Sequence, residues 1–145
     1  MIAVDTNLLV YAHRRDSPWH ERANSALTRL AEGPHRWALP WQVIHEFFGI
    51  VTHPRIYSPP STTQQAIAQL DAWLEAPTVE LIGEDSGYWK VLRLQLERGH
   101  IAGPRVHDAR IAAICLYHGV TELWTADRDF TRFPSLSVRN PLAEP

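Results

Sequence analysis

The stretch Ile2-Ala3-Val4-Asp5-Thr6-Asn7-Leu8-Leu9-Val10-Tyr11-Ala12 organises the rest of the chain. Its first apolar run, Ile2 to Val4, predicts a short buried strand, and a second apolar run follows soon after. Asp5, with Thr6 and Asn7 beside it, stands where the strand ends. In open parallel sheets, ligand chemistry gathers at the carboxyl ends of strands. Asp5 is therefore a candidate site residue, although Asp is also a favoured N-cap for a helix that starts at the next residue.

Strand and helix patterns alternate along the remaining chain. Short apolar runs typical of strands occur at 37–40, 79–82, 122–125 and 137–139. Helical spacing of apolar residues, with capping residues or breakers at its ends, covers 8–13, 18–31, 41–52, 62–75, 86–98 and 107–117. This alternation predicts an α/β fold with a mainly parallel central sheet flanked by helices. The length of 145 residues suits one domain, residues 1–145.

Bulk composition excludes several classes of protein. A hydrophobic content of 45% indicates a globular chain, and no apolar run approaches the roughly 20 residues that cross a bilayer. No basic region precedes the first apolar run, which argues against a signal peptide. A single cysteine, Cys115, fits a reducing compartment, so we expect a cytoplasmic protein without membrane contacts. The formal net charge of −2 gives no global attraction to nucleic acid.

Four carboxylates from distant segments are expected at one edge of this sheet. The strands share one direction and the crossover helices run back, so helix N-termini lie at the edge where strands end. Asp5 and Asp127 each follow a predicted strand, and Asp108 lies in the first turn of a predicted helix. Glu46 lies about five residues into its helix, within roughly 10 Å of the same edge. Because Glu46 borders an apolar stripe, its carboxylate needs a partner or access to water.

Carboxylates gathered without a counter-charge repel one another, and a divalent cation relieves that repulsion. Oxygen ligands suit Mg²⁺, or Mn²⁺, rather than zinc. Mg²⁺ binds through one or two carboxylates plus substrate phosphate, which fits phosphodiester hydrolysis. Taken singly, Asp108 can be only a helix-terminal charge, and Asp127 and Asp129 only turn residues. Their joint placement favours a metal site. His45 and His107 adjoin it, and a surface or capping role is the commoner one for such histidines.

These residues resemble the motifs of the PIN-domain nucleases, and most closely those of the VapC toxins of type II toxin–antitoxin modules. The segments that carry the resemblance are Asp5–Ala12, Glu46, His107–Ala113 and Thr125–Phe130. The resemblance implies a catalytic acidic centre formed by Asp5, Glu46, Asp108 and Asp127. It implies that Asp5 and Asp108 are direct metal ligands and that the other two act through water. The supporting positions that it implies are Thr6, Asn7, Thr125 and Asp129.

The resemblance also implies an activity and partners. It implies an Mg²⁺-dependent endoribonuclease, with Mn²⁺ as a possible substitute, that cleaves RNA and so inhibits translation. It further implies a cognate antitoxin protein that covers the site, and a homodimer. Exposed residues among the six tryptophans would mark contacts with a partner.

Other functions explain the sequence less well. A phosphatase of the haloacid dehalogenase type needs a second Asp two residues after the first, where this chain has Asn7, and its Lys would have to be the mid-helix Lys90. A non-catalytic PIN-like binding module would not need the complete acidic set. A DNA nuclease stays an alternative, because a metal site alone does not distinguish DNA from RNA. No Walker loop or G-x-G-x-x-G run indicates a nucleotide-binding enzyme.

Several arginines flank these motifs and are candidates for contacts with the RNA backbone. They are Arg14, Arg15, Arg110, Arg128 and Arg132. Proximity in sequence does not ensure that they face the site, so their contribution to RNA binding is a separate hypothesis.

Overall fold

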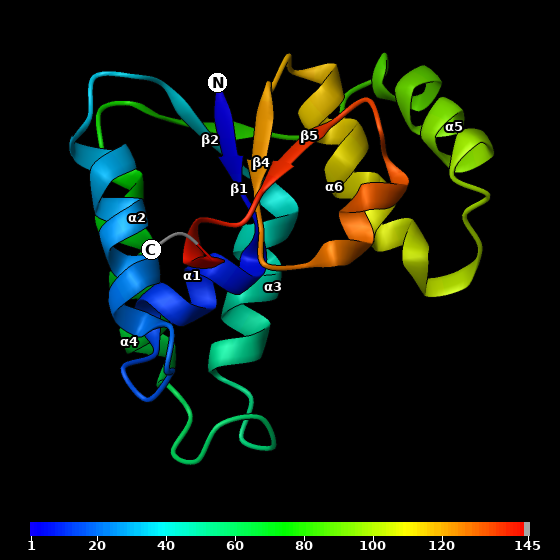
Figure 1. Ribbon diagram of the computed structural model, residues 1–145. Coiled ribbons are helices and arrows are strands. Elements are labelled where there is room, and N and C mark those ends of the chain that lie inside the picture. Colours follow the sequence, from blue (N-terminus) through cyan, green and yellow to red (C-terminus); the bar gives the residue numbers. More distant parts are fainter. Residues whose placement is uncertain (144–145) are drawn as a thin grey trace.

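Five short strands form a parallel sheet with the order β3-β2-β1-β4-β5 (Figure 1). The computed structural model describes residues 1–143. The strands are β1 (Ile2–Val4), β2 (Trp37–Pro40), β3 (Val79–Ile82), β4 (Glu122–Trp124) and β5 (Ser137–Arg139). The predicted α/β fold with a parallel central sheet is therefore confirmed. The predicted domain span of 1–145 includes two residues outside the described range.

Helices connect the strands and cover the sheet. They are α1 (Thr6–His13), α2 (His20–Glu32), α3 (Trp41–Val51), α4 (Thr63–Leu74), α5 (Tyr88–Arg98) and α6 (Val106–Tyr117). Short 3₁₀ turns are η1 (Gly103–Arg105), η2 (Arg128–Arg132) and η3 (Pro141–Ala143). The predicted start of the second helix at residue 18 is wrong. Ser17 instead forms a turn, in which its carbonyl accepts from the His20 amide and its hydroxyl accepts from the Trp19 amide.

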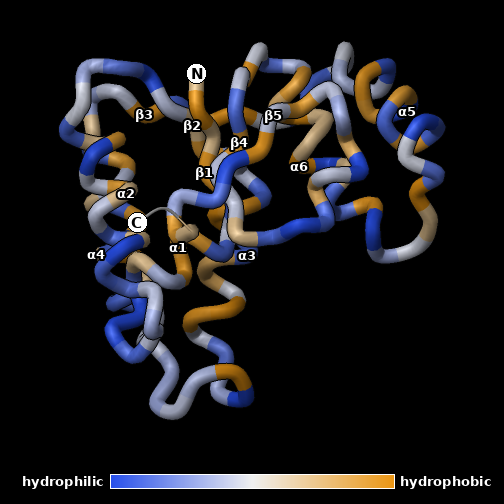
Figure 2. The backbone as a smooth tube through the Cα atoms, in the orientation of Figure 1, coloured by the Kyte–Doolittle hydropathy of each residue, from blue (hydrophilic) through white to orange (hydrophobic). Residues whose placement is uncertain are grey.

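The apolar core follows the central strands and the helices packed on them (Figure 2). Ala3 and Val4 of β1 are fully buried, as is Leu123 of the neighbouring β4. α6 is buried over Ile111–Cys115, which explains its nearly all-apolar sequence. Cys115 is thus a core residue, and burial raises the pKa of its thiol. None of the helices within residues 1–143 has the length and apolar character needed to span a membrane.

Every strand runs in the same direction, so the residues that follow the strands lie at one edge of the sheet. β1 passes into α1 through Asp5 alone, and β2 passes into α3 without any connecting residue. β4 ends at Trp124, and the chain continues through residues 125–127 into η2. Figure 1 shows α1 and α3 starting where the arrows of the sheet end. The carboxyl ends of these three strands therefore define a common rim.

Candidate active site

Asp5 is the most deeply buried acidic residue of the rim, with 5% of its surface exposed. Its Oδ1 accepts a hydrogen bond from the Thr6 amide at 2.8 Å, so it is the N-cap of α1. Its Oδ2 accepts from the Thr125 hydroxyl at 2.7 Å and from Asn7 Nδ2 at 3.3 Å. The capping role predicted as an alternative is thus real. It coexists with a place in the acidic rim, since one oxygen caps the helix and the other faces β4.

Opposing influences set the protonation of Asp5. Burial has the largest effect and raises its pKa, the hydrogen bonds from Thr125 and Thr6 lower it, and the nearby charges of Glu46 and Asp127 raise it, so that the pKa is about 6 overall. All of its hydrogen-bond partners donate, and donors favour the ionised form. At neutral pH the side chain is therefore a buried carboxylate.

A polar network ties the end of β1 to the end of β4. The buried Thr125 hydroxyl, which donates to Asp5, accepts from Asn7 Nδ2 and from the Asp127 amide, both at 3.0 Å. Asn7 Oδ1 accepts from the Ala126 amide at 3.1 Å. Asn7 and Thr125, expected from the sequence to support the carboxylates, thus contact Asp5 directly. The network also holds the loop that carries Asp127.

Glu46 satisfies its need for partners through two neutral donors. Its Oε2 accepts from the Thr6 hydroxyl at 2.7 Å, and its Oε1 accepts from Gln42 Nε2 at 2.7 Å. Gln42 is buried, and its Nε2 also lies 3.4 Å from the carbonyl oxygen of His107, at the start of α6. Gln42 was not among the sequence-predicted residues. Its position four residues before Glu46, on the same helical face, is the signal that could have found it.

Three carboxylates of the rim form a close cluster. One oxygen from each of Asp108, Asp127 and Asp129 lies within 4.8 Å of the others. Asp127 caps η2 by accepting from the Asp129 amide at 2.8 Å, which fixes the relative position of these two side chains. Partial burial raises the pKa of Asp108, and the charges of Asp127, Asp129 and Glu46 raise it further.

This arrangement fits a hard divalent cation. Every side chain of the cluster offers oxygen, and Asp108 and Asp127 are only partly buried, so an ion can reach them. The close cluster includes Asp129, for which the sequence implied a supporting position, and does not include Asp5. Asp5 and Glu46 lie beside it, close enough for their charges to influence one another. The structure thus assembles all four predicted acidic residues at one rim, with Asp129 as a fifth.

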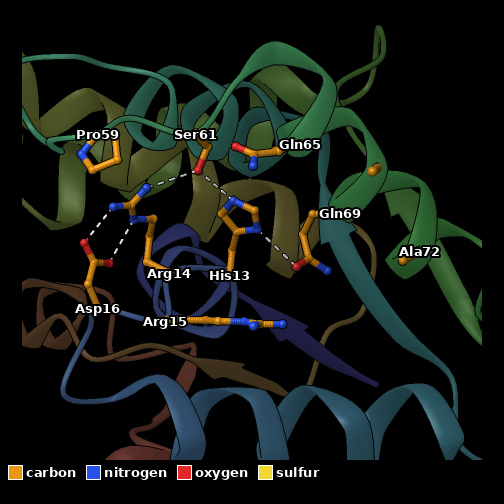
Figure 3. Close-up of a pocket in the computed structure, with 10 residues that line it drawn as sticks. His13, Arg14, Arg15, Asp16, Pro59, Ser61, Gln65, Gln69 and Ala72 are labelled. Atoms are coloured by element: carbon orange, nitrogen blue, oxygen red, sulfur yellow. Dashed lines mark hydrogen bonds and ion pairs between the residues drawn. The ribbon is translucent and has the colours of Figure 1, made fainter.

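The flanking arginines are not all at this rim. Arg14 lies between Asp16, at 2.6 Å, and Ser61, at 3.3 Å (Figure 3). Arg14 and Arg15 line a cavity of about 790 Å³ beside His13, and none of the clustered acidic residues lines it. These two arginines therefore belong to a different surface.

Arg110, in contrast, lies near the acidic rim. It follows Asp108 by two residues on α6 and forms an ion pair with Glu84, which follows β3. Its charge is close enough to Glu46 for the two to interact. Arg110 therefore lies close enough to the rim for a contact with the RNA backbone, and Arg128 stands between Asp127 and Asp129 of the cluster.

Comparison with known proteins shows the family to which the chain belongs. The PIN domain family model matches residues 2–136. Ribonuclease VapC48 of Mycobacterium tuberculosis is 32% identical over 139 residues, which cover 96% of each chain. Ribonuclease VapC43 of the same organism is 36% identical over 142 residues, covering 98% of this chain and 96% of that one.

A solved structure agrees with this assignment. The crystal structure of VapBC2 from Rickettsia felis, bound to a DNA fragment from its promoter, matches with a TM-score of 0.67 and 26% identity. The match covers 97% of this chain and 98% of the other. The whole fold, and not the rim alone, is therefore shared. The chain belongs to the PIN-domain family and, within it, to the VapC ribonucleases.

Proposed function

We propose that this protein is the toxin of a type II toxin–antitoxin module, an Mg²⁺-dependent endoribonuclease that hydrolyses RNA phosphodiester bonds and so inhibits translation. One observation carries the proposal: carboxylates from separate segments converge at the carboxyl edge of the sheet, although their charges disfavour one another's ionised forms. A fold gains no stability from such convergence, whereas a divalent cation requires it. The names of the relatives, which are ribonucleases, support RNA as the substrate.

The proposed roles of the acidic residues come from the resemblance to the VapC family. The family resemblance assigns Asp5 and Asp108 as direct ligands and Glu46 and Asp127 as residues that act through water, and the close cluster of Asp108, Asp127 and Asp129 supports Asp108 in that role and adds Asp129 as a further acidic neighbour. When bound, Mg²⁺ or Mn²⁺ polarises a phosphate and lowers the pKa of water. The protein holds the acidic side chains in fixed orientations. Thr6 and Gln42 hold both oxygens of Glu46, and Asn7 and Thr125 hold Asp5.

The proposal extends to partners and location. A cognate antitoxin protein and a homodimeric state are proposed, supported by the toxin–antitoxin complex among the similar structures and by the exposed tryptophans Trp19 and Trp89. We also propose that residues 1–145 form one PIN domain that acts in the cytoplasm, where an inhibitor of translation meets its substrate.

Cleavage of a mixed cellular RNA pool tests the function. Wild-type protein is incubated with Mg²⁺ or with EDTA, alongside single-stranded and duplex DNA. We expect discrete RNA fragments with Mg²⁺, none with EDTA, and intact DNA. Preferential cleavage of DNA would replace the ribonuclease with a DNA nuclease. A folded protein that binds RNA without cutting it in any divalent metal would be a non-catalytic module.

The Asp108→Asn variant, which keeps side-chain shape but removes charge, links the activity to the cluster. The matched control is Asp71→Asn, an exposed carboxylate on α4 outside the acidic rim. Loss of cleavage in the first variant and full cleavage in the second are expected. Equal activity of Asp108→Asn and wild type would remove the acidic cluster from the reaction.

A further inference from the structure

We propose that Trp41 and His45 form a stacking surface that receives an unpaired base of the RNA substrate next to the scissile phosphate. The proposal rests on the ribonuclease function proposed above and adds a determinant of substrate choice. It concerns α3 residues that lie outside the acidic set and for which the reaction itself supplies no role.

Trp41 occupies a prominent position at the rim. It is the first residue of α3 and directly follows β2, so it lies at the carboxyl edge where the acidic residues gather. The indole is 44% exposed, which is costly for the largest apolar side chain unless something covers it. Gly83, after β3, allows the ring to lie close to the backbone, because a Cβ there would stand 3.2 Å from Trp41 Cδ1. The ring thus lies against Gly83 and keeps part of its surface exposed.

His45 extends this surface along the helix. It follows Trp41 by four residues, so the two rings lie on the same face of α3, about one turn apart. His45 is exposed, and Glu46 is the next residue. Trp41 and Glu46 are separated by about 7.5 Å along the helix axis at 1.5 Å per residue. The same five residues turn the helix by about 140°, so Trp41 and His45 lie on a face of α3 that adjoins the one carrying Gln42 and Glu46.

Charged residues make the surface continuous with the site. The Glu84 carboxylate pairs with Arg110 and is close enough to His45 for their charges to interact. Arg110 in turn interacts with the charge of Glu46. The strip from Trp41 through His45 and Glu84 to Arg110 thus borders the acidic rim. A guanidinium placed there suits contact with a phosphate or with the face of a base.

Stacking would supply RNA affinity that charge alone does not supply in this protein. The net charge is −2 and the catalytic rim is acidic, so nonspecific attraction to the RNA backbone is weak. Unpaired bases stack on aromatic side chains at about 1–3 kcal/mol per base, largely without dependence on charge. Aromatic rings beside the metal-binding rim therefore favour single-stranded RNA as their occupant.

The test compares RNA affinity among α3 variants. Fluorescence anisotropy is measured with labelled single-stranded homopolymers of A, C, G and U, in Ca²⁺ to favour binding over cleavage. We expect Trp41→Ala to weaken binding by about 10-fold or more, His45→Ala to weaken it less, and Trp41→Phe to retain most of the affinity. Trp89→Ala, which removes an exposed tryptophan from α5, should bind like wild type.

Salt dependence separates stacking from charge. The loss of RNA affinity caused by Trp41→Ala should stay constant as the salt concentration rises. The loss of RNA affinity caused by Arg110→Ala should become smaller. Mn²⁺ affinity and thermal unfolding of Trp41→Ala should match wild type, which would show that the site is intact.

Two results would overturn the stacking surface while leaving the ribonuclease in place. One is wild-type RNA affinity in Trp41→Ala from an enzyme that still cleaves RNA. The other is conversion of a dimer to a monomer in Trp41→Ala by light scattering, which would assign this surface to a second copy of the chain. If the wild-type protein neither binds nor cleaves RNA, the proposed function fails and the stacking surface fails with it.

Discussion

The hydroxyl of Thr125 at the end of β4 donates a 2.7 Å hydrogen bond to the buried carboxylate of Asp5, 120 residues earlier at the end of β1. The direction of this bond is fixed. Asn7 Nδ2 and the Asp127 amide both donate to the same hydroxyl, so its single proton must point to Asp5. One side chain thus holds the buried carboxylate and positions the backbone beside Asp127.

Replacing Thr125 with Val should disturb both roles. The variant keeps the shape but leaves Asn7 and the Asp127 amide without their acceptor, so we expect stability to fall by about 1–3 kcal/mol. Mn²⁺ affinity should fall by about 10-fold or more, as is typical for residues that orient metal ligands. Urea unfolding and calorimetric titration measure the two effects. Thr125→Ser, which keeps the hydroxyl, should retain both properties, and equal losses in Ser and Val variants would show that the hydroxyl is not responsible.

Gln42 should act on the reaction through Glu46. Gln42→Leu removes the donor to Glu46 Oε1 but leaves the Thr6 hydroxyl on Oε2. We expect kcat for RNA cleavage to fall by about 10-fold or more, with KM little changed, because Glu46 loses orientation rather than substrate contact. Single-turnover cleavage measures this effect. A change confined to KM would instead place Gln42 in RNA binding.

The effect of Mg²⁺ on stability should depend on pH. The folded-state pKa of Asp5 is raised to about 6, and that of Asp108 is also raised. Without metal, folding therefore retains protons that the unfolded chain has released, so these groups favour folding at low pH. Their contribution is lost as pH rises from about 4 through 6. Mg²⁺ binds the ionised forms, so its stabilising effect should grow over the same range.

Thermal unfolding with saturating Mg²⁺ and with EDTA checks this dependence. The difference in Tm between the two conditions should be much larger near about pH 7.5 than near about pH 5. Taking the difference at each pH cancels the titration of carboxyls outside the site. An equal Tm increase at both pH values would mean that Mg²⁺ does not bind these carboxyl groups.

Much of the acidic rim could be predicted from the sequence because parallel topology alone decides where strands end and helices begin. Asp5, Asp108 and Asp127 occupy such junctions, so alternation of strands and helices was enough to place them together. Thr125 and Asn7 were expected on motif resemblance, and their contacts with Asp5 give that expectation a physical basis.

The remaining features depend on packing that no local pattern encodes. The four-residue spacing of Gln42 and Glu46 is visible in the sequence, but the burial of Gln42 against the start of α6 is not. Asp129 enters the close cluster because the Asp127 side chain caps η2 and turns the chain back on itself. Arg14 flanks the first motif in sequence, yet α1 carries it to the separate cavity beside Ser61.

Mn²⁺ titration by isothermal calorimetry measures whether the acidic rim is a metal centre. Wild type, Asp108→Asn and the exposed-surface control Asp71→Asn are compared at neutral pH. We predict saturable binding by wild type and the control, and a loss of affinity of about 10-fold or more in Asp108→Asn, as expected when a metal ligand is lost. Equal affinity in all three proteins, or no saturable binding by wild type, would show that the acidic rim is not a metal centre.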